Sequence, residues 1–181
     1  KALLSRLRRS QNTSGIIGDC VSASEINSGR NTAYESAMLE TIKQAKQEAD
    51  IVIMCLHSGG QFNSKVEGYT QHLFDIIADA GVDAIICNHA HTTLPIIKKG
   101  HCLIASALGN FSFAPGEGYW VDGVKAEYSA LLTLEVANNK IADHKINICK
   151  CVSKGDGLAV TIPVSNEQEI ETINNRLECE K

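Results

Sequence analysis

Apolar and polar residues follow one another in blocks that predict a strand, a helix and a second strand. Residues 51–56 (IVIMCL) and 82–87 (VDAIIC) are nearly continuous apolar runs, which are typical of parallel strands buried on both faces. Between them, apolar residues recur at helical spacing over about residues 69–80, and Gly81 marks the helix end. This order predicts a β-α-β crossover unit in an α/β sheet.

One helix is expected before this unit and two strands after it. Apolar residues recur at helical spacing over about residues 35–49, which predicts an amphipathic helix. Strands are expected at about residues 95–98 and 102–108. A short strand at Gly15–Cys20 is a further candidate within a polar N-terminal stretch.

The last third of the chain has the pattern of antiparallel strands. Residues 129–137 and 140–148 flank an Asn-Asn pair, and asparagine tolerates the positive φ of a tight hairpin turn. A further strand and a terminal helix are expected at residues 158–164 and 166–179. We therefore predict a single α/β domain in which a parallel β-α-β half is followed by antiparallel hairpins.

The composition fits one globular domain and excludes two classes of partner. The chain has 181 residues, of which 44% are hydrophobic, and a formal net charge of −4. Its basic cluster, Arg6, Arg8 and Arg9, is too short for a nucleic-acid surface. No run approaches the length of a membrane span, and the first residues lack the apolar core of a signal peptide. We expect neither nucleic acid as a partner nor a membrane span in this chain.

The cysteines do not form the pattern of a disulfide framework. There are seven, an odd number, and no CxxC pair occurs. This favours a reducing compartment such as the cytoplasm. Cys149 and Cys151 would share one face of a strand, and chance spacing is a better explanation for them than metal binding.

Three of the expected strand ends carry imidazole or amide side chains. His57 follows the first apolar run, His89 and His91 follow the second, and Asn110 follows the strand at residues 102–108. Ligands of open α/β sheets bind beyond the C-terminal ends of parallel strands, and histidine is the commonest metal ligand among side chains. This joint placement favours a metal site over unrelated loop histidines.

Other candidate residues have equally simple explanations. Gly59 and Gly60 would let backbone amides approach an anion, or they give ordinary loop flexibility. The loop at residues 114–123 (APGEGYWVDG) could cover a substrate, although an ordinary exposed loop is preferred. The remaining histidines are expected at the surface: His72, His101 and His144.

Three segments resemble a known family, and they occur in the family's order. The segments are ADIVIMCLHSGGQFN, DAGVDAIICNHAHTTLPI and SALGNFSF, between residues 49 and 113. They resemble the CapA-type proteins of poly-γ-glutamate capsule biosynthesis, a branch of the calcineurin-like metallophosphoesterase superfamily. The resemblance implies that residues 1–181 are the C-terminal portion of a four-layer α/β/β/α sandwich domain.

The resemblance also implies a site. His57, His89 and His91 would be metal ligands, and His57 and His91 would take part in catalysis. Substrate-binding residues would be Gly59, Gly60 and Asn110. The cofactors would be divalent ions (Mn, Zn or Fe), of which a pair can clamp a phosphoester. The family's earlier acidic and Asn-His ligands have no counterpart here, so we expect an incomplete site with little activity.

The implied function is that of a metal-dependent, phosphoesterase-type hydrolase in bacterial capsule biosynthesis at the cell envelope. Its substrate would be a phosphoester or an acidic polymer. The chain differs from the family pattern at Ser58, Gln61, Cys87 and Ala114. These differences leave two alternatives: a non-catalytic polymer-binding or interaction component of a capsule assembly machine, or a metal-free α/β interaction domain. An unburied sheet face would favour self-association.

Overall fold

The computed structural model describes residues 35–112, 126–153 and 159–178. The chain divides into two units, Lys1–Glu40 and Thr41–Lys181. Helix α2 spans Glu35–Glu48, which confirms the helix predicted over residues 35–49. Every other element described below lies in the second unit.

Two of the sequence-based expectations fall on parts of the chain that the structure does not describe. They are the short strand at Gly15–Cys20 and the loop at residues 114–123.

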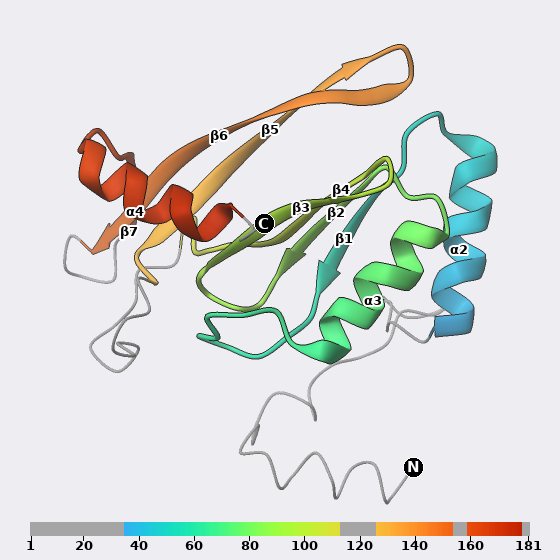
Figure 1. The fold of residues 1–181 in the computed structure, drawn as a ribbon, viewed down its shortest axis with the longest axis horizontal. Helices are drawn as coiled ribbons and strands as arrows, with labels where there is room; N and C mark the ends of the chain where they lie inside the picture. The colour runs from blue at the N-terminus through green and yellow to red at the C-terminus, as the bar shows by residue number, and fades with distance from the viewer. Residues whose placement is uncertain (1–34, 113–125, 154–158, 179–181) are drawn as a thin grey trace, which may run out of the picture. The chain divides into compact units, whose positions relative to one another are not determined.

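The first sheet is mixed. Its strands, in spatial order, are β1 (Ile53–His57), β2 (Ala84–Asn88), β4 (Cys102–Leu108) and β3 (Thr93–Lys99) (Figure 1). The first three are parallel, and β3 pairs antiparallel with β4. Helix α3 (Gly68–Asp79) connects β1 to β2, so the predicted β-α-β unit is confirmed.

Helix α3 lies along one face of this sheet (Figure 1). Its side chains Phe74 and Ile77 are fully buried, as is Ile85 of β2. The helix ends where the sequence predicts, because Gly81 adopts a φ of 92° and its N–H donates to the carbonyl of Ala78 at 2.9 Å. Of the apolar positions that predicted this helix, Leu73 and Ile77 are buried, Ile76 and Ala80 are partly buried, and the spacing did not include the buried Phe74.

The prediction that both strands of this unit are buried on both faces is wrong for β1. Leu56 is buried, but Ile53 is 46% exposed and Cys55 and His57 are also exposed. Among the described strands, β1 is at the edge of the sheet, and α3 can cover only one of its faces. The apolar run predicts a strand, but it does not indicate that this strand is the outermost one of its sheet.

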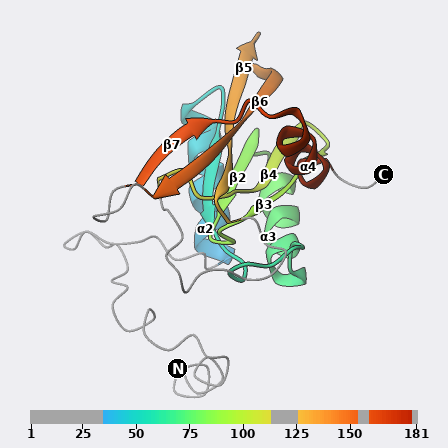
Figure 2. The same cartoon turned by 90° about the vertical axis from the view of Figure 1, so that its left-hand side faces the viewer.

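The second sheet is antiparallel, with strands in the order β5 (Tyr128–Ala137), β6 (Lys140–Ser153) and β7 (Ala159–Pro163) (Figure 2). The β5–β6 turn consists of Asn138 and Asn139, with φ values of 51° and 57°. Two positive φ values are the mark of a type I′ turn, so the predicted hairpin is confirmed. Helix α4 (Glu167–Leu177) follows, and the side chain of Asn166 caps it by accepting from the N–H of Glu169 at 3.1 Å.

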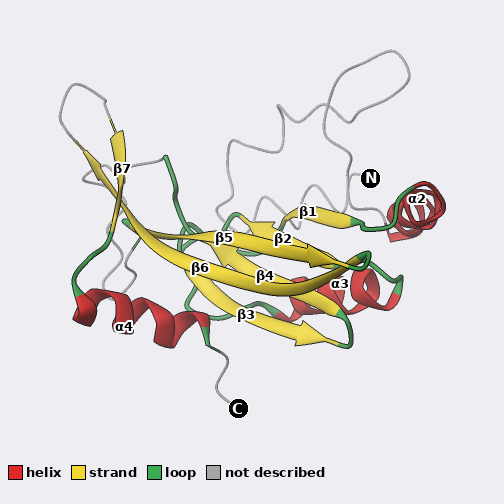
Figure 3. Ribbon diagram, turned by 90° about the horizontal axis from the view of Figure 1, so that it is seen from above, coloured by secondary structure: helices red, strands yellow, loops and turns green. Residues whose placement is uncertain are grey.

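The second sheet and α4 lie beside the first sheet (Figure 3). An apolar cluster joins them to its β3–β4 side. Its buried members are Tyr128, Ala130, Ile148, Ile173 and Leu177, and partly buried Ile96 and Leu108 of the first sheet pack against them. This cluster positions the start of β5 beside the end of β4. In the part of the chain that the structure describes, no helix is long and apolar enough to cross a membrane.

Candidate functional site

The three candidate histidines gather at the edge of the first sheet that is formed by the C-terminal ends of its parallel strands. This edge of strand ends is distinct from the side of the sheet formed by β1. His57 is the last residue of β1, rather than the residue after it, and pairs with Asn88 at the end of β2. His89 and His91 follow in the β2–β3 connection. The ring centroids of His57 and His89 are 4.5 Å apart, and those of His89 and His91 are 6.2 Å apart. The parallel register of β1 and β2 therefore delivers these side chains to one place.

The backbone at this edge is strained. His89 and His91 adopt φ values of 111° and 56°, and Phe62 in the β1–α3 loop adopts 57°. Such conformations cost on the order of 1–3 kcal/mol each for residues with a Cβ, and they cluster at functional sites. The Phe62 N–H donates to the carbonyl of Ala90 at 2.7 Å, and its ring stacks on His91 with centroids 5.4 Å apart. The β1–α3 loop and the β2–β3 connection thus contact and stabilise each other.

Asn110 connects the edge to the start of the second sheet. Its side chain is buried, and its Oδ1 lies 2.8 Å from Nδ1 of His91. Its Nδ2 donates to the carbonyl of Ala126 at 3.0 Å and to that of His91 at 3.4 Å. The amide that the sequence placed at a third strand end therefore contacts one of the candidate histidines directly.

The pKa of His89 is lowered, which favours its neutral imidazole form. Burial lowers the pKa of His89, the nearby His57 and His91 lower it further, and Glu67 raises it. A neutral ring keeps a lone pair, which a metal ligand or a proton acceptor needs. The lowered pKa of His89 and the positive φ values thus occur at the same place, which is therefore a candidate site.

Glu67 is a residue that the sequence reasoning missed. It is the N-cap residue of α3 by position, and its Oε1 accepts from Nδ2 of Asn63 at 2.6 Å. Its carboxylate is the acidic group whose charge reaches His89. The signal for it was an acidic residue at the start of a predicted helix that follows a strand-end histidine.

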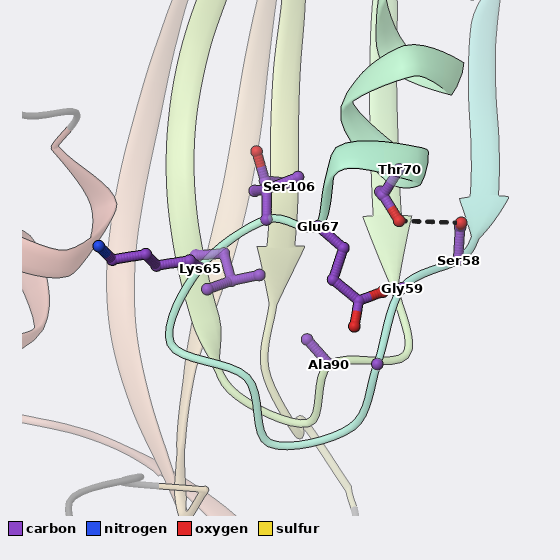
Figure 4. Close-up of a pocket in the computed structure, with 10 residues that line it drawn as sticks. Ser58, Gly59, Lys65, Glu67, Thr70, Ala90 and Ser106 are labelled. Carbon is purple, nitrogen blue, oxygen red and sulfur yellow. Dashed lines mark hydrogen bonds between the residues drawn. The ribbon is translucent and has the colours of Figure 1, made fainter. Parts of the chain in front are cut away.

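A small pocket lies beside the histidines. It is lined by residues of the β1–α3 loop, the start of α3 and the neighbouring strands, including Ser58, Gly59, Gly60, Glu67, Thr70, Ala90 and Ser106 (Figure 4). Ser58 and Thr70 share a hydrogen bond of 3.2 Å across it. Gly59 has a φ of 102°, and a Cβ on Gly60 would collide with Asn63 and Glu67. The positive φ favours glycine at position 59, whereas at position 60 the side-chain ends of Asn63 and Glu67 would have to move to admit a larger residue.

The donor chemistry of the cluster fits a divalent transition metal in part. Two imidazoles on one tetrahedral ion have ring centroids roughly 5 Å apart, which the separation of 4.5 Å between His57 and His89 approaches. The separation of 6.2 Å between His89 and His91 is wider. Within residues 35–112, 126–153 and 159–178, no group of three or more His, Cys, Asp or Glu side chains is arranged to hold a metal ion.

The remaining histidines lie away from this edge. His72 on α3 and His101 in the β3–β4 turn are exposed, and His144 on β6 is partly buried.

Comparison with known proteins assigns the family. The family described as "Bacterial capsule synthesis protein PGA_cap" matches residues 7–115. The chain belongs to this family. It is 32% identical over 87 residues to the PGA biosynthesis protein CapA of Bacillus subtilis (strain 168), and 30% identical over 97 residues to the capsule biosynthesis protein CapA of Bacillus anthracis. The resemblance to CapA-type proteins is confirmed.

The match to these PGA_cap relatives is partial. It covers 48% and 50% of this chain but 23% of each relative. The family match includes the three histidines and Asn110 and ends before β5. The site edge is thus the part of the chain that carries the family relationship.

Proposed function

We propose that this chain provides the histidine-bearing part of a divalent-metal site in a CapA-type protein of the bacterial cell envelope. The observation that carries the proposal is the meeting of His57 and His89, 4.5 Å apart by ring centroid, at the ends of adjacent parallel strands. Phosphoesterase-type chemistry fits such a site, because a divalent ion with imidazole ligands supplies Lewis acidity to a phosphoester. Mn, Zn or Fe would suit these ligands.

The proposed roles follow from position. His57 and His89 would share one ion. His91 lies farther from His89 and is held by Asn110, so it would act as the third ligand or as the group that accepts a proton near the substrate. The backbone of Gly59 and Gly60 would approach the oxygens of a phosphoester or acidic polymer. The proposed setting is a four-layer α/β/β/α sandwich, which is supported by a helix on one face of the first sheet and a second sheet packed on β3 and β4.

A second candidate function is a non-catalytic, polymer-binding component of a capsule assembly machine. The observation that favours it is that, among the described residues, three metal-ligand side chains are not arranged around one point. In this case the histidines would contact the acidic polymer as hydrogen-bond donors. The two candidates differ in metal content.

Metal binding tests the proposal directly. We expect about one Zn²⁺ or Mn²⁺ per chain, because three neutral imidazoles carry no negative charge to offset the repulsion between two ions. His57→Ala or His89→Ala should weaken the affinity by about 10- to 100-fold. His72→Ala, an exposed histidine on α3, is the matched control and should bind as the unaltered chain does.

The measurement is chelator competition with elemental analysis, together with hydrolysis of bis(p-nitrophenyl) phosphate. With a single ion per chain, hydrolysis should stay close to the background rate, because the clamp on both attacking and leaving oxygens needs two ions. Equal metal content in the His57, His89 and His72 variants, or none in the unaltered chain, would refute the metal site and leave the polymer-binding function.

A further inference from the structure

The hydrogen bonds of Asn110 fix which end of its side-chain amide faces His91. Its Nδ2 donates to two backbone carbonyls, those of Ala126 at 3.0 Å and His91 at 3.4 Å. A flipped amide would place an oxygen against both carbonyls, opposing acceptors to acceptors. The oxygen end therefore faces Nδ1 of His91, at 2.8 Å.

This orientation determines where the His91 ring carries its proton. An amide oxygen can only accept a hydrogen bond, so Nδ1 of His91 must be the donor. In a neutral ring the lone pair is then on Nε2. We infer that Asn110 is a positioning residue, which locks His91 in the Nδ1–H tautomer so that Nε2 is the atom that meets a divalent cation or accepts a proton. The purpose of the lock rests on the proposed function, but the tautomer itself does not.

The surroundings hold the lock in place from three segments. The Phe62 ring stacks on His91 at an interplanar angle of 24°, which limits rotation of the imidazole. Asn110 is 6% exposed, so water does not compete freely for its amide. Ala126 is 1% exposed and lies just before β5, so the amide ties the end of β4 to the beginning of the second sheet.

Gly109 makes this tie possible. Its φ is 77°, and it forms a bridge with Ser129 of β5. A Cβ at this position would collide with the carbonyl oxygen of Tyr128 and lie 3.1 Å from Cα of Ser129. The Gly-Asn pair therefore has a joint purpose: the glycine lets β5 approach, and the asparagine then reaches both Ala126 and His91.

Long-range ¹H–¹⁵N NMR of the metal-free chain, with ¹⁵N-labelled histidine, tests the inference. The protonated and unprotonated ring nitrogens give well-separated signals, and His91 is assigned by its loss in His91→Gln. We expect the Nδ1–H form in the unaltered chain. Asn110→Leu, which removes the amide, should move His91 to the Nε2–H form or to a mixture, while the signals of His144 stay unchanged.

An Nε2–H form of His91 in the unaltered chain would overturn the inference, and so would an unchanged tautomer in a folded Asn110→Leu variant. If that variant does not fold, as its amide spectrum would reveal, the smaller Asn110→Ser variant replaces it, since its hydroxyl can donate to Nδ1 and permits the other tautomer. A separate zinc titration distinguishes the two proposals: Asn110→Leu should weaken binding by about 10-fold. A correct tautomer with no zinc binding in any variant would refute the metal site and leave the lock.

Discussion

Asp83 holds a buried negative charge just before β2, at the opposite end of that strand from His89. It is 7% exposed, and it accepts from the N–H of Val52 at 2.8 Å and from Nζ of Lys46 at 3.0 Å. Burial alone would raise the pKa of this carboxyl, but the Val52 and Lys46 hydrogen bonds outweigh burial and hold the pKa below its usual value of 3.8. The charged form is therefore the one that stabilises the fold.

The sign of this shift predicts how stability changes with pH. Because the folded pKa is depressed, Asp83 contributes fully above about pH 4 and loses its contribution as the pH falls through the folded pKa. Asp83→Asn should lower the free energy of unfolding by about 1–3 kcal/mol near neutral pH, with a smaller difference at about pH 2. Urea unfolding at both pH values measures this.

Asp79→Asn is the control for Asp83. Asp79 pairs with Lys99, but its side chain is 69% exposed, and exposed pairs contribute about 0–1 kcal/mol. A pH-independent loss in Asp83→Asn, or an equal loss in the Asp79 variant, would contradict the assignment.

The positions of single residues at the candidate site could be predicted where those residues lie at the ends of strands. His57, His89, His91 and Asn110 meet because parallel strands end together, and apolar runs reveal where strands end. Phe62 and Glu67 were not predictable in the same way. They come from the β1–α3 loop, whose path depends on positive φ values and on glycine contacts that have no period in the sequence.

At the scale of elements, hydrophobic periodicity located the main helices and strands because each period matches one backbone geometry. The apolar runs could not show the order of the strands in the sheet. The run at residues 51–56 predicted burial on both faces, yet its strand has one exposed face at the sheet edge. Edge position depends on which other strand pairs alongside, and no local pattern contains that information.

The junction of β4 and β5 gives a prediction at this scale. Gly109→Ala would force a Cβ against the carbonyl of Tyr128 at a φ of 77°, so the Gly109–Ser129 bridge must open. We expect a loss of about 2–4 kcal/mol in unfolding free energy, from backbone strain and the collision together. Gly100→Ala is a matched control, because its φ is 60° and no atom lies within 4 Å of its added Cβ.

Thermal and urea unfolding of both glycine variants measure this difference. The Gly100 variant carries the strain alone and should lose about 1 kcal/mol. Equal losses in the two variants would mean that the approach of β5 to Gly109 adds nothing to stability.

At the scale of the second unit, the two sides of the first sheet are unequally covered: the β3–β4 side is packed against the second sheet, and β1 is more exposed. Tyr128, Ala130 and Ile148 pack toward Ile96 and Leu108, on the β3–β4 side of the first sheet. On β1, by contrast, Ile53 and Cys55 are exposed. Whether a strand will be covered depends on contacts between distant segments, which no local pattern contains.

An exposed apolar edge strand predicts self-association. Within the described residues β1 is the outermost strand of its sheet, and an edge strand with unpaired backbone groups and apolar side chains readily pairs with a second copy. Ile53, which is 46% exposed, lies on this strand. A lysine there places a charge on the edge, which is how natural edge strands avoid pairing.

We therefore expect the chain to form a dimer through β1, and Ile53→Lys should raise its dissociation constant at least about 10-fold, equivalent to about 1.4 kcal/mol. Tyr69→Lys is the matched control, because Tyr69 is 64% exposed but lies on helix α3, so dimerisation should be unchanged. Sedimentation velocity over a range of protein concentrations measures both. A monomer at every concentration, or equal weakening by both substitutions, would show that the β1 edge does not pair, and the exposed side chains on this strand would then need another explanation.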